Sequence, residues 1–461
     1  MEPKENRQIV NKRFTLFITM LSAFLTPFMA SSMNIALPTI GKEFGINALT
    51  LSWVATSFLL TAAAFLVPFG KIADIVGRKK IFTLGIIIYS FSSLMSAFSP
   101  DELMLIISRT IQGLGGSMIF GTAIAILTSV FPANERGKVI GYNLASTYLG
   151  LSLGPFIGGV LTHQFGWRSI FFFSFALSVI LIPLIFWKLK GEWAEAKGEK
   201  FDFKGSVVYM IGLIAIMYGF SILSSLAGAV LLVCGIIIMI IFFRMEYRIK
   251  YPVLDLSSFK RNTVFIFSNL AAFINYSATF AVGYLLSLYL QYIKALSPQD
   301  AGIILVTQPI TMALFSPIAG RMSDKIEPQI VATIGMILTV VGLTPFIFLN
   351  SDTSIIYLVA TLFVIGIGFA LFSSPNTNAV MSSVDRRYYG VASASLGTMR
   401  LSGQAISMGI ATFIFAIYLG KVKITPEYYS SFLISTHVIF IIFTILCILG
   451  VFASMARGKL R

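Results

Sequence analysis

The stretch Gly70–Lys80, with the sequence GKIADIVGRKK, is a short charged segment between two apolar runs. Each run is long enough to cross a bilayer, because about 20 apolar residues of helix span the hydrocarbon. Segments that keep Lys and Arg next to hydrocarbon face the cytoplasm. The stretch therefore predicts a membrane protein and fixes which way the chain faces.

The composition agrees with this prediction. Hydrophobic residues make up 57% of the 461 residues, charged residues 11%, and the mean hydropathy is +0.87, so too little charge is present to cover a soluble globule. The net charge of +15 does not indicate nucleic-acid binding, because the cations fall in short clusters between apolar runs. Cys234 and Cys447 lie inside apolar runs without the spacing of a metal site. We expect an all-α polytopic protein of the plasma or inner membrane, with no metal and no cofactor.

Fourteen apolar runs of membrane-spanning length follow one another. With the amino terminus inside, most of the 34 lysines and arginines fall in the tails or in cytoplasmic connections, and Lys42, Arg168, Lys294, Lys421 and Lys423 fall on the other side. This asymmetry favours fourteen spans with both termini in the cytoplasm. The approximate cores of the runs are 14–40, 49–70, 81–99, 103–131, 138–162, 168–187, 205–223, 226–243, 262–290, 299–319, 328–349, 354–380, 390–419 and 429–453.

The segment Gly320–Lys325 follows the tenth run and repeats the Gly-x-x-x-Asp spacing of Gly70–Lys80, which we call the first turn. It then continues as Ile326-Glu327-Pro328. A repeat at the same place in a second set of six runs indicates a duplicated six-helix unit. The predicted organisation is a cytoplasmic tail at 1–13, a six-helix bundle at 14–187, a cytoplasmic linker at 188–204, two additional helices at 205–243, a second linker at 244–261, a second six-helix bundle at 262–453 and a tail at 454–461.

Further patterns follow in chain order. They are Arg109-x-x-Gln112-Gly113-x-Gly115-Gly116 in the fourth run, Gly150-x-x-x-Gly154-Pro155-x-x-Gly158-Gly159 in the fifth, Trp167-Arg168 before the sixth and Phe201-Asp202 before the seventh. Together with the first turn, they resemble the major facilitator superfamily, specifically its fourteen-span drug:proton antiporter branch, over nearly the whole length. The resemblance implies a major facilitator fold of two six-helix bundles plus two inserted helices, and efflux of drugs in exchange for protons.

Gly70, Asp74, Gly77 and Arg78 are candidates for a conformational latch. The glycines permit tight backbone, and Asp74 is suited to cap a helix start and to pair with Arg78. We expect a contact that is made in one conformation and broken in the other. Topology alone explains the two lysines that follow.

In the fifth run, Gly150, Gly154 and Gly158 recur every four residues, so that one helix face is almost without side chains. Pro155 removes a backbone hydrogen bond and favours a kink beside this seam, and Gly159 adjoins it. Ordinary tight packing explains the pattern as well as a conformational role does, and the resemblance favours the conformational role.

Arg109 and Arg400 lie inside runs, where a charge costs at least ~2.5 kcal/mol, so each should face a cavity or a partner. Gln112 and Gln404 share their helix faces. Each pair is a candidate for substrate or proton handling, or else a structural hydrogen-bond hub. Other polar residues of the runs either line a cavity or hydrogen-bond between helices; they are Ser31, Ser32, Asn34, Asn143, Asn275, Tyr276, Gln308, Asn376 and Asn378.

One departure from the antiporter branch concerns proton coupling. The branch commonly has an Asp in the first span where this chain has Met29, and no replacement carboxylate lies well inside any run. The usual membrane-buried proton carrier is therefore absent. Two arginines without a buried acid disfavour a permanent organic cation and favour neutral, anionic or amphiphilic molecules.

The leading prediction is a monomeric secondary transporter, surrounded by membrane lipid, that exports small lipophilic substrates by alternating access with proton exchange. One alternative is a translocator of lipids or anionic amphiphiles with atypical or no proton coupling, and another is a receptor or scaffold that no longer transports. The sequence has no Gly-x-x-x-x-Gly-Lys-Ser/Thr loop and no grouped catalytic residues. Enzyme activity and a nucleic-acid partner are therefore not expected.

Overall fold

The computed structural model of the chain describes residues 11–223, 225–249, 251–253, 262–384, 389–420 and 422–458. These residues form α-helices and short 3₁₀ and π turns, and no strand occurs among them. The predicted tails at 1–13 and 454–461 and the predicted linker at 244–261 lie partly outside the described residues, as does the side chain of Asp324. The α-helices are α1 (Lys12–Phe44), α2 (Ala48–Val76), α3 (Arg78–Ala97), α4 (Glu102–Val130), α5 (Ala133–Phe165), α6 (Arg168–Lys188), α7 (Phe203–Ser221), α8 (Leu226–Glu246), α9 (Thr263–Thr279), α10 (Val282–Leu288), α11 (Pro298–Leu305), α12 (Thr307–Lys325), α13 (Pro328–Leu343), α14 (Ile355–Ser382), α15 (Tyr389–Tyr418) and α16 (Tyr429–Ala456).

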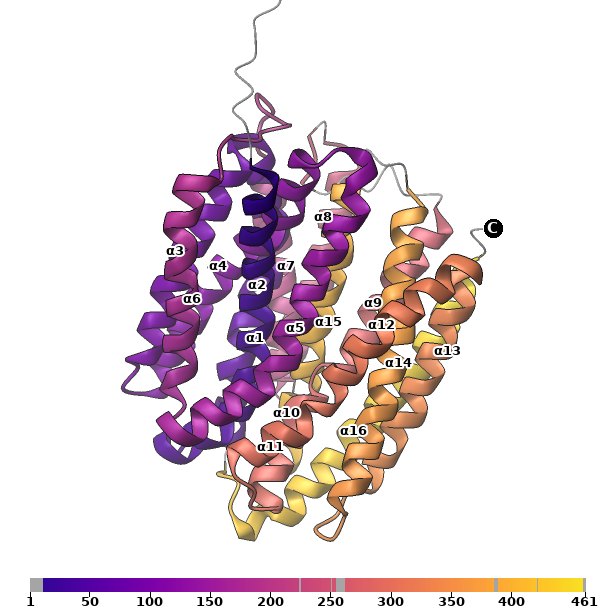
Figure 1. The fold of residues 1–461 in the computed structure, drawn as a ribbon. Helices are drawn as coiled ribbons and strands as arrows, with labels where there is room; N and C mark the ends of the chain where they lie inside the picture. The colour runs from indigo at the N-terminus through magenta and orange to yellow at the C-terminus, as the bar shows by residue number, and fades with distance from the viewer. Residues whose placement is uncertain are drawn as a thin grey trace, which may run out of the picture.

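Fourteen helical segments of the described residues are long and apolar enough to cross a membrane, which confirms the fourteen predicted spans. An even number of spans returns the chain to the side on which it started. The start of α1 and the end of α16 accordingly lie at the same end of the bundle (Figure 1). We call this the terminal end and the opposite one the far end.

Polar residues at the ends of the apolar runs begin several of these helices. The side chains of Asn47, Asp101 and Asp202 each accept a hydrogen bond from the backbone N–H three residues further on, at 2.9, 2.8 and 2.9 Å. Such a cap satisfies one of the donors that a helix start leaves free. The Phe201-Asp202 pair of the sequence thus begins α7.

The segment Gly70–Lys80 is mostly helix rather than the turn that the sequence suggested. Helix α2 continues to Val76 and α3 begins at Arg78, so Gly77 alone separates them, with a φ of 132° that favours glycine. Gly70 is therefore helical. The expectation that Asp74 caps a helix start was wrong, because Asp74 lies in the last turn of α2 and α3 has no side-chain cap. Hydropathy marks where the apolar run ends, whereas backbone hydrogen bonds continue the helix past it.

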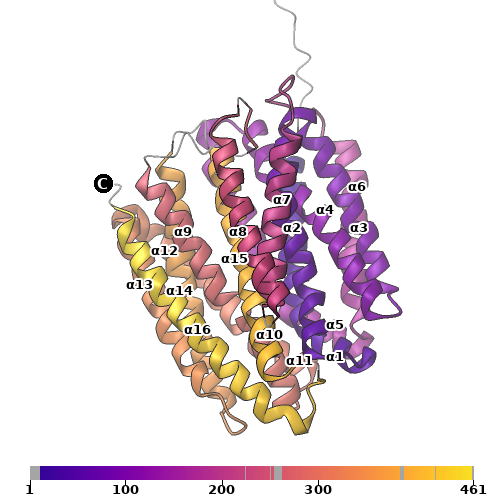
Figure 2. The same ribbon diagram turned by 180° about the vertical axis from the view of Figure 1, so that it is seen from behind.

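The helices form two halves, α1–α6 and α9–α16, with the hairpin of α7 and α8 against both (Figures 1 and 2). In the hairpin, the Tyr209 hydroxyl donates to the Ala63 carbonyl of α2 at 3.3 Å. The ring of Phe220 lies 6.1 Å from that of Phe413 on α15. The two inserted helices therefore pack on the edge where the halves meet.

Two spans of the second half are broken, although the sequence predicted continuous runs at 262–290 and 299–319. The chain leaves α9 near Phe280, and a π-helical turn, Tyr289–Ile293, follows α10. The N–H of Ala281 donates to the Ser407 hydroxyl at 3.0 Å, so a neighbouring helix satisfies a backbone group at the break. In the other run, Pro309 has no N–H for the carbonyl four residues earlier, and the chain bends at Val306 between α11 and α12.

Candidate functional site: a central cavity and a clamped turn

A cavity of about 150 Å³ lies between the two halves, with walls from α1, α2, α4 and α5 on one side and from α9, α14 and α15 on the other. A second cavity of about 130 Å³ continues from it toward the breaks after α9 and α11. Tyr276, Phe280, Phe369 and Gln404 border both. Because the two cavities share these lining residues, we treat them as one elongated space, which we call the central cavity.

Contacts between the halves close the far end of this space. The Ser287 hydroxyl donates to the Asn34 carbonyl at 2.5 Å, and the Gln291 amide donates to the Ile35 carbonyl at 2.9 Å. One turn beyond, the Tyr292 hydroxyl donates to the Pro38 carbonyl at 3.2 Å. The larger cavity extends the other way, to Met381 and other residues near the terminal end. The central cavity thus lies on the terminal side of a closed far end.

The wall of the central cavity is largely apolar and carries one formal charge among the described residues, the guanidinium of Arg400. The carbon of this guanidinium lies 5.3 Å from the centre of the Tyr276 ring, within cation–π range. Tyr276 in turn packs edge-on to Phe369 at 5.5 Å. No Asp, Glu or His of the described residues borders the space.

The predicted polar residues divide into those that border the central cavity and those that do not, although Asn143 of the first group also donates to the Thr19 carbonyl of α1 at 3.0 Å. Those that border the central cavity are Ser31, Asn34, Asn143, Tyr276, Gln308, Arg400 and Gln404. The others hydrogen-bond to neighbouring helices: Ser32 donates to the Gly154 carbonyl at 3.0 Å, Asn275 to the Met336 sulfur at 3.1 Å, Asn376 to the Ser268 carbonyl at 3.1 Å and Asn378 to the Ser323 hydroxyl at 3.0 Å.

Arg109 lies away from this cavity, inside the first half. Its Nε donates to the Val54 carbonyl at 3.2 Å, its Nη1 donates to the Gln112 side chain, and its guanidinium stacks 4.7 Å from the centre of the Phe58 ring. The Gln112 amide nitrogen in turn donates to the Ser93 hydroxyl at 2.7 Å. Both side chains are buried, so the protein itself supplies the partners that a buried charge needs.

The glycine-rich face of α5 contacts α1. A Cβ added at Gly150 would lie 2.5 Å from the Phe24 carbonyl oxygen, and one at Gly158 would lie 2.6 Å from the Cβ of Ser32. A Cβ added at Gly154 would likewise collide with Ser31. These helices therefore approach as closely as the spacing predicted.

A second face of α5 contacts the other half. A Cβ at Gly159 would lie 2.7 Å from the Pro298 carbonyl oxygen of α11, and a Cβ at Gly302 would collide with the Pro155 carbonyl. Pro155 and Gly159 therefore border the boundary between the halves, near the closed far end. One motif thus serves two contacts, within one half and between halves.

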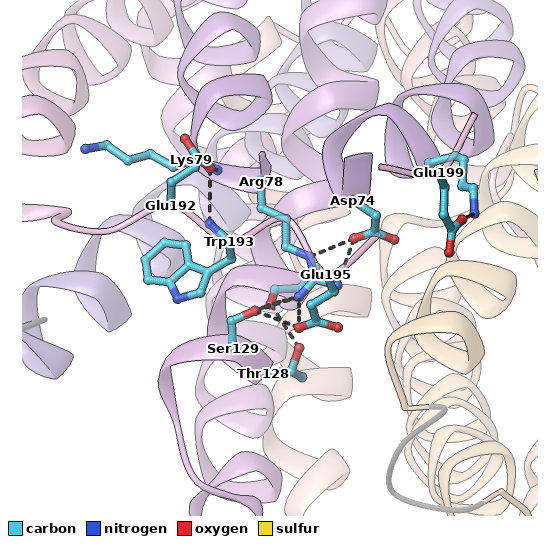
Figure 3. Close-up of polar contacts among 11 residues, drawn as sticks. Asp74, Arg78, Lys79, Thr128, Ser129, Glu192, Trp193, Glu195 and Glu199 are labelled. Atoms are coloured by element: carbon cyan, nitrogen blue, oxygen red, sulfur yellow. Dashed lines mark hydrogen bonds and ion pairs between the residues drawn. The ribbon is translucent and has the colours of Figure 1, made fainter. Parts of the chain in front are cut away.

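Arg78 holds together the turn between α2 and α3 (Figure 3). Its guanidinium is 2.8 Å from the Asp74 carboxylate, and its Nη1 donates to Glu195 at 2.7 Å and to the Ser129 hydroxyl at 2.6 Å. The same nitrogen reaches the Ala125 carbonyl of α4 at 3.2 Å. Only 7% of Arg78 is exposed, so this cation is partnered rather than solvated.

The linker 189–202 packs directly on this turn. The Arg78 N–H donates to the Trp193 carbonyl at 2.8 Å, and the Ala196 N–H donates to the Asp74 carbonyl at 3.0 Å. Its acidic side chains add to these contacts, because Glu192 accepts from the N–H of Lys79 at 2.8 Å and Glu199 pairs with Lys71 at 2.7 Å (Figure 3). We call the turn together with this linker the clamp.

Sequence reasoning missed the three glutamates of the clamp. Glu192, Glu195 and Glu199 recur every three or four residues, opposite a turn that carries four cations, and that charge complementarity was the available signal. It also missed Tyr148, which borders the cavity and whose hydroxyl shares a 2.9 Å hydrogen bond with the Ser373 hydroxyl of the other half. Nothing in the sequence separates this tyrosine from the others.

Met29, where the antiporter branch commonly has an Asp, does not border the central cavity. It is fully buried, and its sulfur accepts a hydrogen bond from the Ser174 hydroxyl of α6 at 3.3 Å. Another pair joins α1 to α6 at the far end, where Glu43 accepts from Arg168 at 2.6 Å and from the Trp167 indole at 2.7 Å. The Trp167-Arg168 motif therefore fastens α6 to α1.

Two helical halves with a cavity between them, closed at one end, define a membrane transporter. The chain matches the model of the Major Facilitator Superfamily over residues 19–246 and 269–459, and it belongs to that family. It is 30% identical to the riboflavin transporter RibZ of Clostridioides difficile, over 95% of this chain and 96% of that protein. It is 27% identical to the multidrug resistance protein Stp of Mycobacterium tuberculosis, over 88% of this chain and 76% of that protein.

Among solved structures, the fold resembles that of peptide transporter POT in complex with sulfate. The TM-score is 0.69 at 16% sequence identity, over 95% of this chain and 93% of that one. The chain is therefore a transporter and not an enzyme, and a multi-pass protein of the plasma membrane.

Proposed function

We propose that this protein exports amphiphilic small molecules by alternating access. The observation that carries the proposal is the central cavity, which is largely apolar, has a few hydrogen-bonding side chains and lies behind a closed far end. The excess of Lys and Arg at the terminal end supports placing that end in the cytoplasm. In this conformation the protein would take up its substrate from the cytoplasmic side.

Release on the other side requires the far end to open. The hydrogen bonds of Ser287, Gln291 and Tyr292 to α1 would then break, and α11 would move away from Gly159. All three bonds use carbonyls of one helix segment, Asn34 to Pro38, so one rigid-body movement of the halves can release them together. The close seam of α5 on α1 would stay intact, because both helices belong to the first half.

The clamp acts as the latch in this proposal. Its contacts join α2, α3 and α4 to the linker that leads into α7, and α7 packs at the edge between the halves. Movement of the halves would therefore pull on the linker. The clamp would hold in the conformation seen here and loosen in the other.

Multidrug resistance proteins among the relatives support export, and proton exchange is the coupling that the resemblance implies. The described cavity wall has no carboxylate or imidazole, so protons would have to be carried elsewhere than beside the substrate. Riboflavin is a second candidate substrate, because RibZ covers nearly the whole chain and aromatic side chains line the cavity.

Transport by purified protein in proteoliposomes tests this function. The panel is ethidium, riboflavin, N-phenyl-1-naphthylamine and its sulfonated analogue 8-anilinonaphthalene-1-sulfonate, each followed with and without an imposed pH gradient. We expect saturable movement of at least one neutral compound, and acceleration by the gradient if protons are exchanged. Movement no faster than in protein-free liposomes, for the whole panel, would contradict the proposal.

A substitution at the boundary between the halves tests alternating access. Gly159→Ala would place a Cβ against the Pro298 carbonyl, whereas a Cβ at Gly141 of the same helix meets nothing within 4 Å. We expect Gly159→Ala to lower the transport rate about tenfold, since ~1.4 kcal/mol on a barrier has that effect. Gly141→Ala should transport like the parent protein, and equal rates in both variants would argue against movement at this boundary.

A further inference from the structure

The two arginines inside the membrane have opposite environments. Arg109 is fully enclosed and donates to Val54 and Gln112. Arg400 borders the central cavity, and its side chain hydrogen-bonds to Tyr276, but its Nε is buried without a hydrogen-bond partner among the residues that the structure describes. No ion pair of Arg400 occurs among the residues that the structure describes. The structure thus leaves a donor of Arg400 unsatisfied beside a space that can hold a molecule.

A guanidinium in this position needs an acceptor. Its planar fork of N–H donors matches a carboxylate, sulfonate or phosphate, and such charge-assisted bonds are stronger than neutral ones. A cation without an ion pair inside a membrane span is costly, so a ligand that supplies the missing charge gains more there than in water. The neighbouring side chains add no negative charge, because Gln404 and Tyr276 are neutral.

The surroundings of Arg400 also favour an aromatic body. The Tyr276 ring lies under the guanidinium, and Phe369 packs on Tyr276 at 5.5 Å. Phe280 borders the same part of the cavity. Aromatic rings stack well against such a group of side chains, at distances of about 4.5–7 Å between centroids.

We propose that Arg400 is the recognition residue for aromatic organic anions, with the anionic group on the guanidinium and the rings against Tyr276, Phe280 and Phe369. This proposal rests on the proposed function, since it names the substrate class of the same cavity. It assigns the one charge among the described residues of the wall to binding and leaves Arg109 as a structural residue. It also predicts that permanent cations are poor substrates.

A matched pair of fluorescent probes tests the proposal. 8-Anilinonaphthalene-1-sulfonate and N-phenyl-1-naphthylamine share their ring system and differ by the sulfonate. In the purified parent protein in nanodiscs, we expect the sulfonate to bind about tenfold more tightly than the neutral amine, a difference typical of a charge-assisted hydrogen bond. Ethidium should bind more weakly than either. Empty nanodiscs give the lipid background.

Substitutions then locate the effect. Arg400→Gln should lose about tenfold in affinity for the sulfonate and change that of the amine less than about twofold. Arg400→Lys keeps the charge but loses the planar fork of donors. Its affinity for the sulfonate should therefore lie between those of the parent and of Arg400→Gln. Arg321→Gln is the control for net charge, because Arg321 is exposed near the end of α12 and does not border the central cavity.

The outcomes separate the two proposals. Equal loss of both probes in Arg400→Gln, or a parent protein that prefers the amine or ethidium, would overturn the role of Arg400. The second of these results needs no variant, so it decides even if Arg400→Gln fails to fold. If the amine is transported without any preference for the sulfonate, only the Arg400 proposal fails; if the parent transports no compound of the transport panel, the proposed function fails.

Discussion

The turn after α2 is held by the ion pairs of a buried arginine, whereas the two cations of its repeat after α12 are exposed. Arg78 in the first turn contacts two carboxylates, a hydroxyl and a carbonyl, and is almost completely buried. In the second turn, Arg321 and Lys325 are exposed, and neither forms an ion pair with another described residue. Pro328 begins the next helix there, in place of a glycine hinge.

This difference shows what a duplication copies and what it does not. Both turns join consecutive helices at the terminal end (Figure 1). The order of the spans is sufficient to place them there. The ion pairs of the first turn depend on the linker 189–202, which packs on that turn and has no described counterpart at the second. A latch is therefore expected in one half only. The predictions below alter one turn and compare it with the other.

The largest effect is expected for Arg78→Gln. The change removes the cation that joins α2, α4 and the linker, and it leaves Asp74 and Glu195 without the cation that pairs with both. A hydrogen bond from a buried cation is worth about 1.5–3 kcal/mol, and Arg78 makes such bonds to Ser129 and Ala125 besides its more exposed ion pairs, so we expect transport to slow at least about tenfold. The measurement is the initial transport rate in proteoliposomes.

Arg321→Gln is the matched control for this variant. It removes the same charge from the repeated turn, where the side chain is exposed, and should change the rate less than about twofold. If both variants slow transport equally, the ion pairs of the first turn have no special role, and surface charge alone explains the result.

A smaller effect is expected for Asp74→Asn. The amide keeps the shape of the side chain and can still accept from Arg78, but the attraction across 2.8 Å loses its charge. We expect turnover to slow about fivefold while binding of substrate changes less than about twofold, since Asp74 does not border the central cavity. Equal transport rates in variant and parent would rule out the latch.

Much of the fold could be predicted from the sequence, because membrane spans are set by local properties. The fourteen apolar runs and the placement of the cations were sufficient to predict the spans. The repeated turn was sufficient to predict two halves. The bend at Val306 and the break near Phe280 could not be predicted, although the first has Pro309 nearby. A broken span is stable only if another helix, here through Ser407, satisfies the free backbone.

The site could be predicted less well, because it depends on contacts between distant segments. The Arg78–Asp74 pair is local, four residues apart, and was predicted. The Arg78–Glu195 pair joins residues 117 positions apart, which no local pattern indicates. Neighbouring residues also diverge: both Ser31 and Ser32 contact α5, but a rotation of about 100° along the helix places only Ser31 at the central cavity.

A still smaller effect is expected for Glu195→Gln. This carboxylate contacts Arg78 at 2.7 Å, but 65% of its side chain is exposed, and exposed ion pairs contribute about 1 kcal/mol or less. We expect transport to slow about two- to threefold at low salt, and the difference from the parent to shrink at high salt because ions screen the pair. A difference that is independent of salt would mean that the side chain acts through packing.

The smallest effect is expected for Lys71→Gln, which breaks the pair with Glu199 at the outer edge of the clamp. The two side chains are 16% and 33% exposed, and neither contacts Arg78. The backbone bonds between the linker and the turn remain, so the linker should stay docked and transport should change less than about twofold. Hydrogen exchange at the Ala196 amide measures the docking directly, because that N–H donates to the Asp74 carbonyl. Faster exchange in Lys71→Gln than in Arg78→Gln would contradict this ranking, because it would mean that Lys71 contributes more than Arg78 to docking of the linker.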